Sequence, residues 1–190
     1  MRMILSAVLA TCGLAVAPSP AWSVPGDCPP FCDRIPDSAW IAPTAIPLYP
    51  VYRWPGLAGL AVTATPPGFR FEETCASPQI AGDARNFAVA ARAVVPNPER
   101  QWQLQVQVMH WRGETWRGGQ TALATFEAAV AALGDCQRTA PLSSPSVTTR
   151  QPDRMAAVIS GFGPGREVLH EYLLVDPRSS TVTELAMWAL

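Results

Sequence analysis

The stretch QWQLQVQVMHW, residues 101–111, alternates between apolar and polar side chains and predicts a β-strand. Successive side chains of a strand point to opposite faces of the sheet, so the two kinds would lie on different faces. The apolar set is Trp102, Leu104, Val106 and Val108, and the polar set is Gln101, Gln103, Gln105 and Gln107. We expect the apolar set to face a core and the glutamines to face solvent.

The glutamine face is a candidate ligand-binding surface. A Gln amide carries both donors and an acceptor, and side chains two apart in a strand repeat about every 7 Å, which suits the hydroxyls of a polar polymer. Flat tryptophan rings would complete such a glycan site. The candidate residues are Gln103, Gln105, Gln107, Trp111 and Trp116. The alternative is that this face is simply the solvated side of an antiparallel sheet.

Residues 121–135, TALATFEAAVAALGD, predict the main helix. Its apolar stripe is Leu123, Phe126, Val130 and Leu133, which recur at helical spacing. Thr121 would cap the first turn, and Gly134 would end the helix in the left-handed conformation. Few polar residues lie outside the stripe, so we expect the helix to pack flat on a sheet.

Three strands are predicted after this helix, at residues 155–162, 167–175 and 181–188, following a Pro/Ser-rich connection. The GFGPG segment between the first two favours a hairpin loop over a nucleotide site, because no helix follows it. Residues 83–95 fit a helix or a strand, and the strand is favoured. The predicted class is α+β: an antiparallel sheet with one main amphipathic helix on a face, in a single domain over residues 69–190.

A proline-rich segment precedes this domain. Proline lacks an amide donor, so residues 24–68 favour neither a continuous helix nor a central strand. The segment also carries aromatic residues such as Trp40 and Trp54, which disordered segments rarely contain. We expect an arm packed on the domain, with a free proline-rich ligand for a partner as the alternative.

The first residues are typical of a secretory signal peptide. Arg2 precedes an apolar run, and Ala21-Trp22-Ser23 matches the small-x-small pattern of a cleavage site. We expect cleavage after Ser23, leaving an extracytoplasmic protein that is secreted or in the cell envelope. One alternative is an uncleaved membrane anchor, although about 15 apolar residues are fewer than the ~20 that span a bilayer. The other alternative is lipidation at Cys12.

Removal of residues 1–23 leaves four cysteines, and an even number in an exported chain predicts disulfides. We favour the pairs Cys28–Cys32 and Cys75–Cys136 among the three possible connectivities. The first pair is local, and the second would join an irregular segment to the end of the helix. The C-x3-C spacing of CPPFC does not match a redox-active pair, and no Cys/His spacing matches a zinc module.

The sequence contains few groups that could perform catalysis. No lysine occurs, which excludes Schiff-base chemistry, and the net charge of −1 argues against a nucleic-acid partner. The alternative function is a cryptic hydrolase or metal-dependent enzyme that uses His110 and His170 with Glu171. Ser160 has no base beside it in the sequence. We therefore predict no catalytic residue, no metal and no cofactor.

The start of the chain, the Cys-Pro arm and the Ala-rich helix ending in Gly-Asp-Cys resemble small exported proteins of mycobacteria and related actinobacteria. The layout over residues 69–190 is similar to the extracellular sensor domain of a mycobacterial serine/threonine protein kinase, or to the fold shared by the Mog1 nuclear-transport factor and the PsbP photosystem subunit. This resemblance implies a non-catalytic, envelope-associated domain with a cleft beside its sheet. It implies no particular site residue.

The expected function is a disulfide-bonded, non-catalytic protein of binding or scaffold type, with a cell-wall glycan or an envelope protein as its partner. A second alternative is a membrane-tethered protein-interaction module, which requires that the signal segment be retained.

Overall fold

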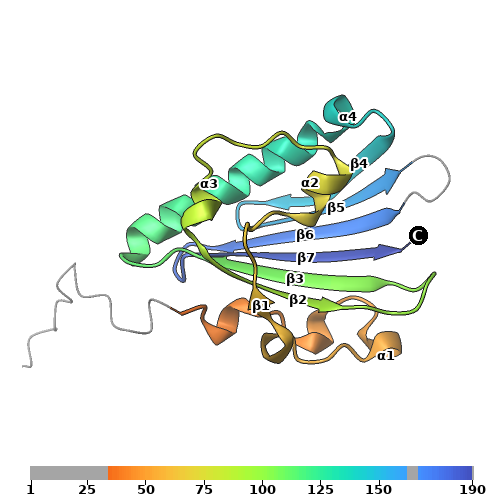
Figure 1. Cartoon of the computed structure of the whole chain (residues 1–190), viewed down its shortest axis with the longest axis horizontal. Coiled ribbons are helices and arrows are strands. Elements are labelled where there is room, and N and C mark those ends of the chain that lie inside the picture. The colour runs from red at the N-terminus through yellow and green to blue at the C-terminus, as the bar shows by residue number, and fades with distance from the viewer. Residues whose placement is uncertain (1–33, 162–166, 190) are drawn as a thin grey trace, which may run out of the picture.

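The computed structural model describes residues 34–161 and 167–189, and these form a mixed α+β protein with one antiparallel sheet (Figure 1). Its strands are β1 (Val62–Thr63), β2 (Val89–Val95), β3 (Gln103–His110), β4 (Ser143–Gln151), β5 (Arg154–Gly161), β6 (Val168–Asp176) and β7 (Thr181–Ala189). Its α-helices are α1 (Tyr49–Tyr52), α2 (Arg70–Thr74), α3 (Thr115–Gly134) and α4 (Cys136–Thr139). The α+β class is therefore confirmed. The expected signal peptide, Cys28, Cys32 and the GPG turn lie outside the described residues.

The seven strands lie in the order β1-β2-β3-β7-β6-β5-β4, and every neighbouring pair is antiparallel. The three strands predicted after the helix correspond to β5, β6 and β7. Residues 89–95 form β2, as favoured, whereas Ala84–Phe87 before it is a 3₁₀ turn. This order places β3 and β7 in the interior of the sheet.

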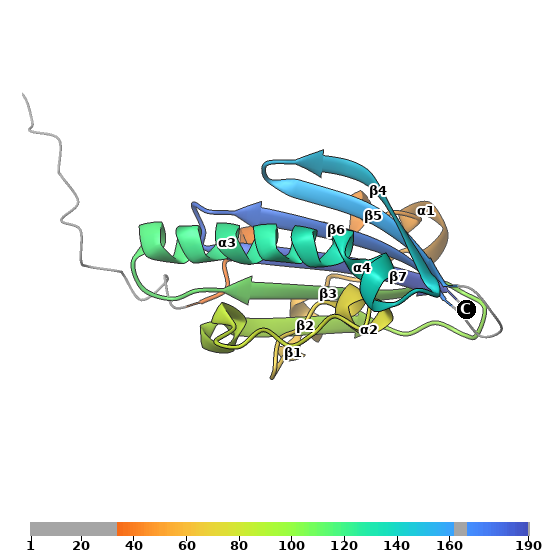
Figure 2. The ribbon, with the colours of Figure 1, turned by 90° about the horizontal axis from the view of Figure 1, so that it is seen from above.

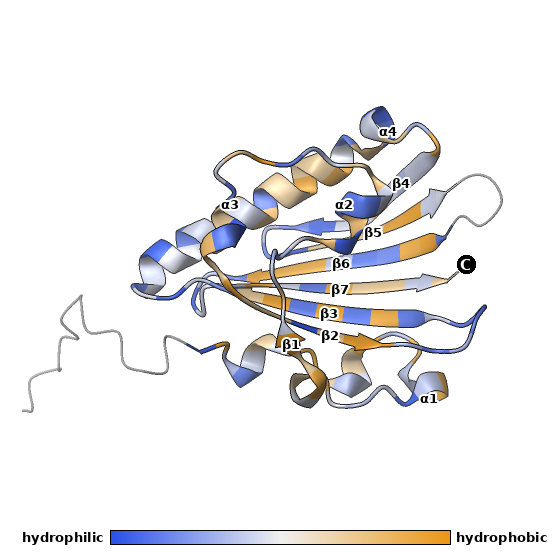
Figure 3. Cartoon of the chain, in the orientation of Figure 1, coloured by the Kyte–Doolittle hydropathy of each residue, from blue (hydrophilic) through white to orange (hydrophobic). Residues whose placement is uncertain are grey.

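Both faces of β3 are covered, contrary to the expectation of one solvated face. Every residue from Leu104 to His110 is buried. Leu104 and Val106 belong to one apolar core, and Met109, of the opposite parity, belongs to another. The alternating bands of hydropathy along β3 in Figure 3 are thus two buried faces of different polarity.

Helix α3 covers one face of the sheet and packs on β6 and β7. Its side chains Phe126, Val130 and Leu133 join the core on this face, as the predicted stripe requires. The helix begins at Thr115, six residues before the predicted start at Thr121. The first turns of the helix were missed because they contain Gly118 and Gly119, and glycine has a low helix propensity.

The helix ends at Gly134 as predicted, but the predicted capping was wrong at both ends. Thr121 does not cap the helix; its hydroxyl donates to the Arg117 carbonyl at 3.0 Å, one turn earlier in the same helix. Gly134 is the last helical residue and does not have a positive φ, and Asp135 after it is also in the right-handed region. The chain therefore continues almost directly into α4.

Residues from the proline-rich segment cover the other face of the sheet. Ile46, Trp54 and Leu57 are buried against Leu104 and Met187. The Trp54 indole N–H donates to the Pro47 carbonyl at 2.7 Å, which satisfies its polar atom inside this core. In Figure 2 the sheet separates α3, near the viewer, from α1, behind it.

The Pro/Ser-rich connection after the helix is a strand, not the loop that was expected. It forms β4 at one edge of the sheet, and its pairing with β5 is irregular between Val147 and Thr149. Proline is tolerated at an edge because one side of an edge strand needs no ladder donors, which explains Pro145. Among the described residues, no helix is long and apolar enough to cross a membrane.

Candidate functional site

The predicted glutamine row lies inside the protein. Gln107 is fully buried, and Gln105 is 7% exposed. The Gln107 amide donates to the Gly68 carbonyl at 3.1 Å, and its oxygen accepts from the Arg92 guanidinium at 2.6 Å. The expectation of an open face was wrong because the chain before α2 closes over these amides and uses their hydrogen bonds.

The other members of the predicted surface do not form one site. Gln103 is partly buried, and its amide exchanges hydrogen bonds with the backbone of Asn97. Trp111 is 6% exposed, and its indole N–H donates to the Ala84 carbonyl at 2.9 Å. Trp116 is 57% exposed, with the Arg117 guanidinium 5.0 Å from its ring centre. Gln103 lies at the start of β3 and Trp116 follows its end, so the two side chains cannot form one continuous binding surface.

A buried pair of carboxyl groups is the most unusual feature beside the glutamines. Glu171 on β6 and Glu184 on β7 are both 0% exposed. Glu184 accepts hydrogen bonds from the Gln105 amide at 3.1 Å and from the backbone N–H of Arg70. Neither oxygen of Glu171 makes a hydrogen bond of regular geometry within the part of the chain that the structure describes. A buried carboxylate without partners is costly, so this pair favours protonation.

The pKa values of both glutamates are raised. Burial, and then the neighbouring Glu184, raise the pKa of Glu171 well above its ordinary value. Burial also raises the pKa of Glu184, to about 7, although the Arg70 N–H and the Gln105 amide oppose this shift. The two carboxyls therefore hold protons at pH values where an exposed glutamate is ionised.

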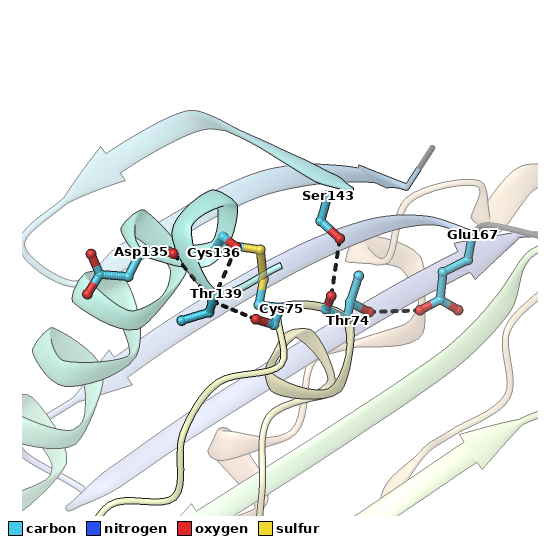
Figure 4. Close-up of a disulfide and its surroundings, with 7 residues drawn as sticks. All are labelled: Thr74, Cys75, Asp135, Cys136, Thr139, Ser143 and Glu167. Carbon is cyan, nitrogen blue, oxygen red and sulfur yellow. Dashed lines mark hydrogen bonds between the residues drawn. A yellow bond between two sulfur atoms is a disulfide. The ribbon is translucent and has the colours of Figure 1, made fainter. Parts of the chain in front are cut away.

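Helix α2 lies over this pair and is anchored at both ends. Its N-terminal anchor is the bond from the Arg70 N–H to Glu184. At its other end Cys75 is joined to Cys136, which confirms this predicted disulfide, and the Thr74 hydroxyl donates to Glu167 at 2.9 Å (Figure 4). Phe71, between the two anchors, is fully buried.

Three arginines surround the site, but each already has acceptors. The Arg70 guanidinium binds Glu73 and Glu167 and lies over the Trp188 ring. Arg92 binds Gln107 and the Gly68 carbonyl. Arg85 forms salt bridges with Asp83 and Glu72. The hydrogen bonds of these arginines are therefore made to other groups, although the charges of Arg70 and Arg92 partly oppose the raised pKa values of Glu171 and Glu184.

The Arg85 cluster borders a shallow groove along α3. Burial opposes ionisation of Asp83, but its bonds to Arg85 prevail and lower the pKa of Asp83. The groove between this cluster and Ala124, Ala128 and Ala132 of α3 has a volume of ≈ 160 Å³. Pockets for drug-sized ligands usually measure roughly 300–1,000 Å³. This groove is smaller than such pockets.

The two histidines proposed for catalysis are not brought together. His110 pairs with Thr181 and His170 with Met187, so β7 separates their strands and about 20 Å separates their positions along it. His110 Nδ1 lies 3.0 Å from the Ser179 carbonyl oxygen. His170 packs edge-on against Trp102, and burial lowers its pKa.

Glu171 and Ser160, the other residues considered for catalysis, do not share a site with the histidines either. Glu171 lies beneath α2, whereas His170 contacts Trp102 on the opposite face, as strand alternation predicts. Ser160 on β5 lies between Ser144 and Val168 of its neighbouring strands. Within the described ranges, no group of three or more His, Cys, Asp or Glu side chains could hold a metal ion.

A strand-parity signal could have revealed the buried pair. Glu171 shares its parity with Leu169 and Leu173, and Glu184 shares its parity with Val182 and Ala186. A carboxylate in a row of core residues predicts a buried charge. The hydrogen bonds of Arg70, Arg85 and Arg92 could not be predicted from the sequence, because they form only when α2 and the loop after it pack on the sheet.

These features define an α+β protein with a seven-stranded antiparallel sheet, one described disulfide and a buried glutamate pair beneath a short helix. No family model, no curated protein and no solved structure matches this chain.

Proposed function

We propose that this chain is an exported, disulfide-bonded and non-catalytic protein of binding or scaffold type, located in the cell envelope or secreted. In this proposal residues 1–23 are a cleaved signal peptide, and residues 24–68 are an arm of the single domain over residues 69–190. Its partner is an envelope protein or a cell-wall glycan.

The Cys75–Cys136 disulfide carries this proposal. Both cysteines are fully buried, and the bond links segments 61 residues apart. Cytoplasmic reductants keep most thiols reduced, whereas exported proteins commonly depend on such bonds. A buried structural disulfide is therefore compatible with an oxidising compartment.

The surface of the described residues supports binding rather than catalysis. The carboxyl pair is closed to solvent, and the histidines are apart. The groove along α3 is small and bordered by alanines, which suits contact with a macromolecule. For a glycan partner, Trp116 is the exposed aromatic residue of the predicted set that could stack on a sugar ring.

Fractionation of cells that make the full chain tests this proposal. We expect the protein in the envelope or medium fraction, with Val24 at its N-terminus and without free thiols by mass spectrometry after alkylation. Cytosolic protein with the four thiols free would contradict export, and an intact N-terminus in the membrane fraction would favour the membrane-tethered alternative.

The same fractionation includes a Trp116→Ala variant to test the glycan partner. We expect this variant to move from the envelope fraction to the medium, with at least a threefold lower retention on isolated cell-wall polysaccharide. Leu142→Ala is the matched control, because Leu142 is 55% exposed and follows α4, whereas Trp116 lies in the first turn of α3. Equal retention of both variants would exclude Trp116 as the glycan platform.

A further inference from the structure

We propose that α2 is a pH-controlled flap, which stays closed over the sheet while Glu171 and Glu184 retain a proton and opens when both carboxyls are ionised. Opening of α2 would be a conformational property of the fold, independent of the proposed location and partner.

The closed position of α2 depends directly on one member of the pair. The N–H of Arg70, the first residue of the helix, donates to Glu184. Glu184 and Glu171 lie on neighbouring strands, so a charge on one disfavours a charge on the other. The bond from Arg70 by itself favours the ionised form of Glu184, so the force that would open the site is the repulsion between two buried carboxylates beneath α2.

The charged groups around the pair offset a second charge only in part: Arg70 lowers the pKa of Glu171 and Arg92 that of Glu184, but burial outweighs both effects. Helix α2 contributes Arg70 and Glu72, of which Arg70 also binds Glu73 and Glu167 outside the pair. Strand β2 contributes Arg92, which is bonded to Gln107 and Gly68. Strand β3 contributes the uncharged Gln105 and Gln107. The buried residues of α3 that cover this face are also uncharged.

Opening of α2 is the least disruptive response to this charge. The helix has only five residues, and a helix of this length is not stable without tertiary contacts. The interior strands β3 and β7, in contrast, are paired on both sides. The Cys75–Cys136 disulfide would keep the C-terminal end of α2 attached, so the helix would swing away from its N-terminal end. Opening would expose Phe71, Gln105 and Gln107.

The direction of the pH effect follows from the raised pKa values. In the open state both glutamates are solvated, with pKa values near the ordinary 4.5. In the closed state the pKa of Glu184 is about 7 and that of Glu171 is well above its ordinary value. The closed state is therefore fully favoured below the ordinary value, and it loses stability as the pH rises through about 7. Between the open-state and closed-state pKa values of a glutamate, the open state has lost the proton that the closed state keeps. Each such proton makes opening about tenfold more favourable for every unit of pH increase.

Hydrogen exchange of the intact, oxidised chain between about pH 5 and pH 9 tests the flap. After division by the intrinsic exchange rates, we expect the α2 amides to lose protection by at least tenfold over this range. The β7 amides should stay protected at the same pH values. Loss of protection in α2 and β7 together would show global unfolding and would overturn the proposal, as would constant protection of α2.

Two variants assign the effect to the buried pair. Glu171→Gln removes one ionisable group, so we expect at least tenfold slower exchange of the α2 amides at pH 9 than in the original chain. Glu127→Gln on the exposed surface of α3 is the control and should keep the original pH profile. A Glu171→Gln profile within twofold of the original at every pH would overturn the proposal. If this variant does not fold, Glu184→Gln provides the same comparison, and the profile of the original chain remains decisive.

Discussion

Two adjacent glycines determine how closely α3 approaches the turn between β6 and β7. A Cβ atom on Gly119 would lie 2.3 Å from the Pro177 carbonyl oxygen, and one on Gly118 would lie 2.5 Å from Ser180 Oγ. Backbone at Pro177 cannot rotate away as a side chain can. Gly119 is therefore required by packing, even though glycine is a poor helix former.

Substitution of Gly119 by Ala should destabilise the protein by about 2 kcal/mol, because an added methyl group in a closely packed contact forces the backbone apart. Gly134→Ala is the matched control in the same helix. A Cβ atom there meets nothing within 4 Å, and we expect it to stabilise the protein by about 0.5–1 kcal/mol. Urea unfolding measures both values. Equal effects of the two substitutions would contradict the close approach at Gly119.

At the scale of elements, α2 and α4 depend on each other. Neither is long enough to be stable alone, and they are joined by the buried disulfide and by a hydrogen bond of 2.6 Å from the Thr139 hydroxyl to the Cys75 carbonyl. The Ser143 hydroxyl at the start of β4 also donates to the Thr74 carbonyl. Figure 4 shows these contacts around one disulfide.

Loss of this disulfide should lower the free energy of unfolding by about 4 kcal/mol, because the bond closes a long loop in the unfolded chain. The loop is long because the cysteines are 61 residues apart. The double variant Cys75→Ala/Cys136→Ala and the reduced original chain should unfold at similarly low urea concentrations. A double variant within 1 kcal/mol of the oxidised chain would show that the bond does not stabilise the fold.

At the scale of the whole molecule, the sheet is covered on both faces by different parts of the chain. The helices α2 and α3 pack on one core, and residues 46–57 contribute Ile46, Trp54 and Leu57 to the other. Leu104 and Met187 in the sheet are buried by this second contact. Stability of the sheet therefore depends on both coverings.

A chain that starts at Val62 should lose solubility and expose apolar surface, because Leu104, Val106 and Met187 would become accessible to solvent. We expect aggregation in size-exclusion chromatography and increased binding of an apolar fluorescent dye. A chain that starts at Val24 is the control and should remain monodisperse. An unchanged melting temperature and a monodisperse profile for the shorter chain would show that the second core is dispensable.

The local elements and the polarity of their faces could be predicted from the amino-acid pattern alone. Alternation in residues 101–111 predicted β3 and the apolar stripe predicted most of α3, because these signals depend on neighbouring residues. The even number of cysteines favoured the Cys75–Cys136 bond without excluding the other pairings. What covers each face could not be predicted, because it depends on contacts between segments far apart in the chain. Gln107 and Glu184 have polar side chains, yet both are buried because α2 and the chain before it dock on them. Strand periodicity shows which side chains share a face, but long-range packing decides whether that face meets water.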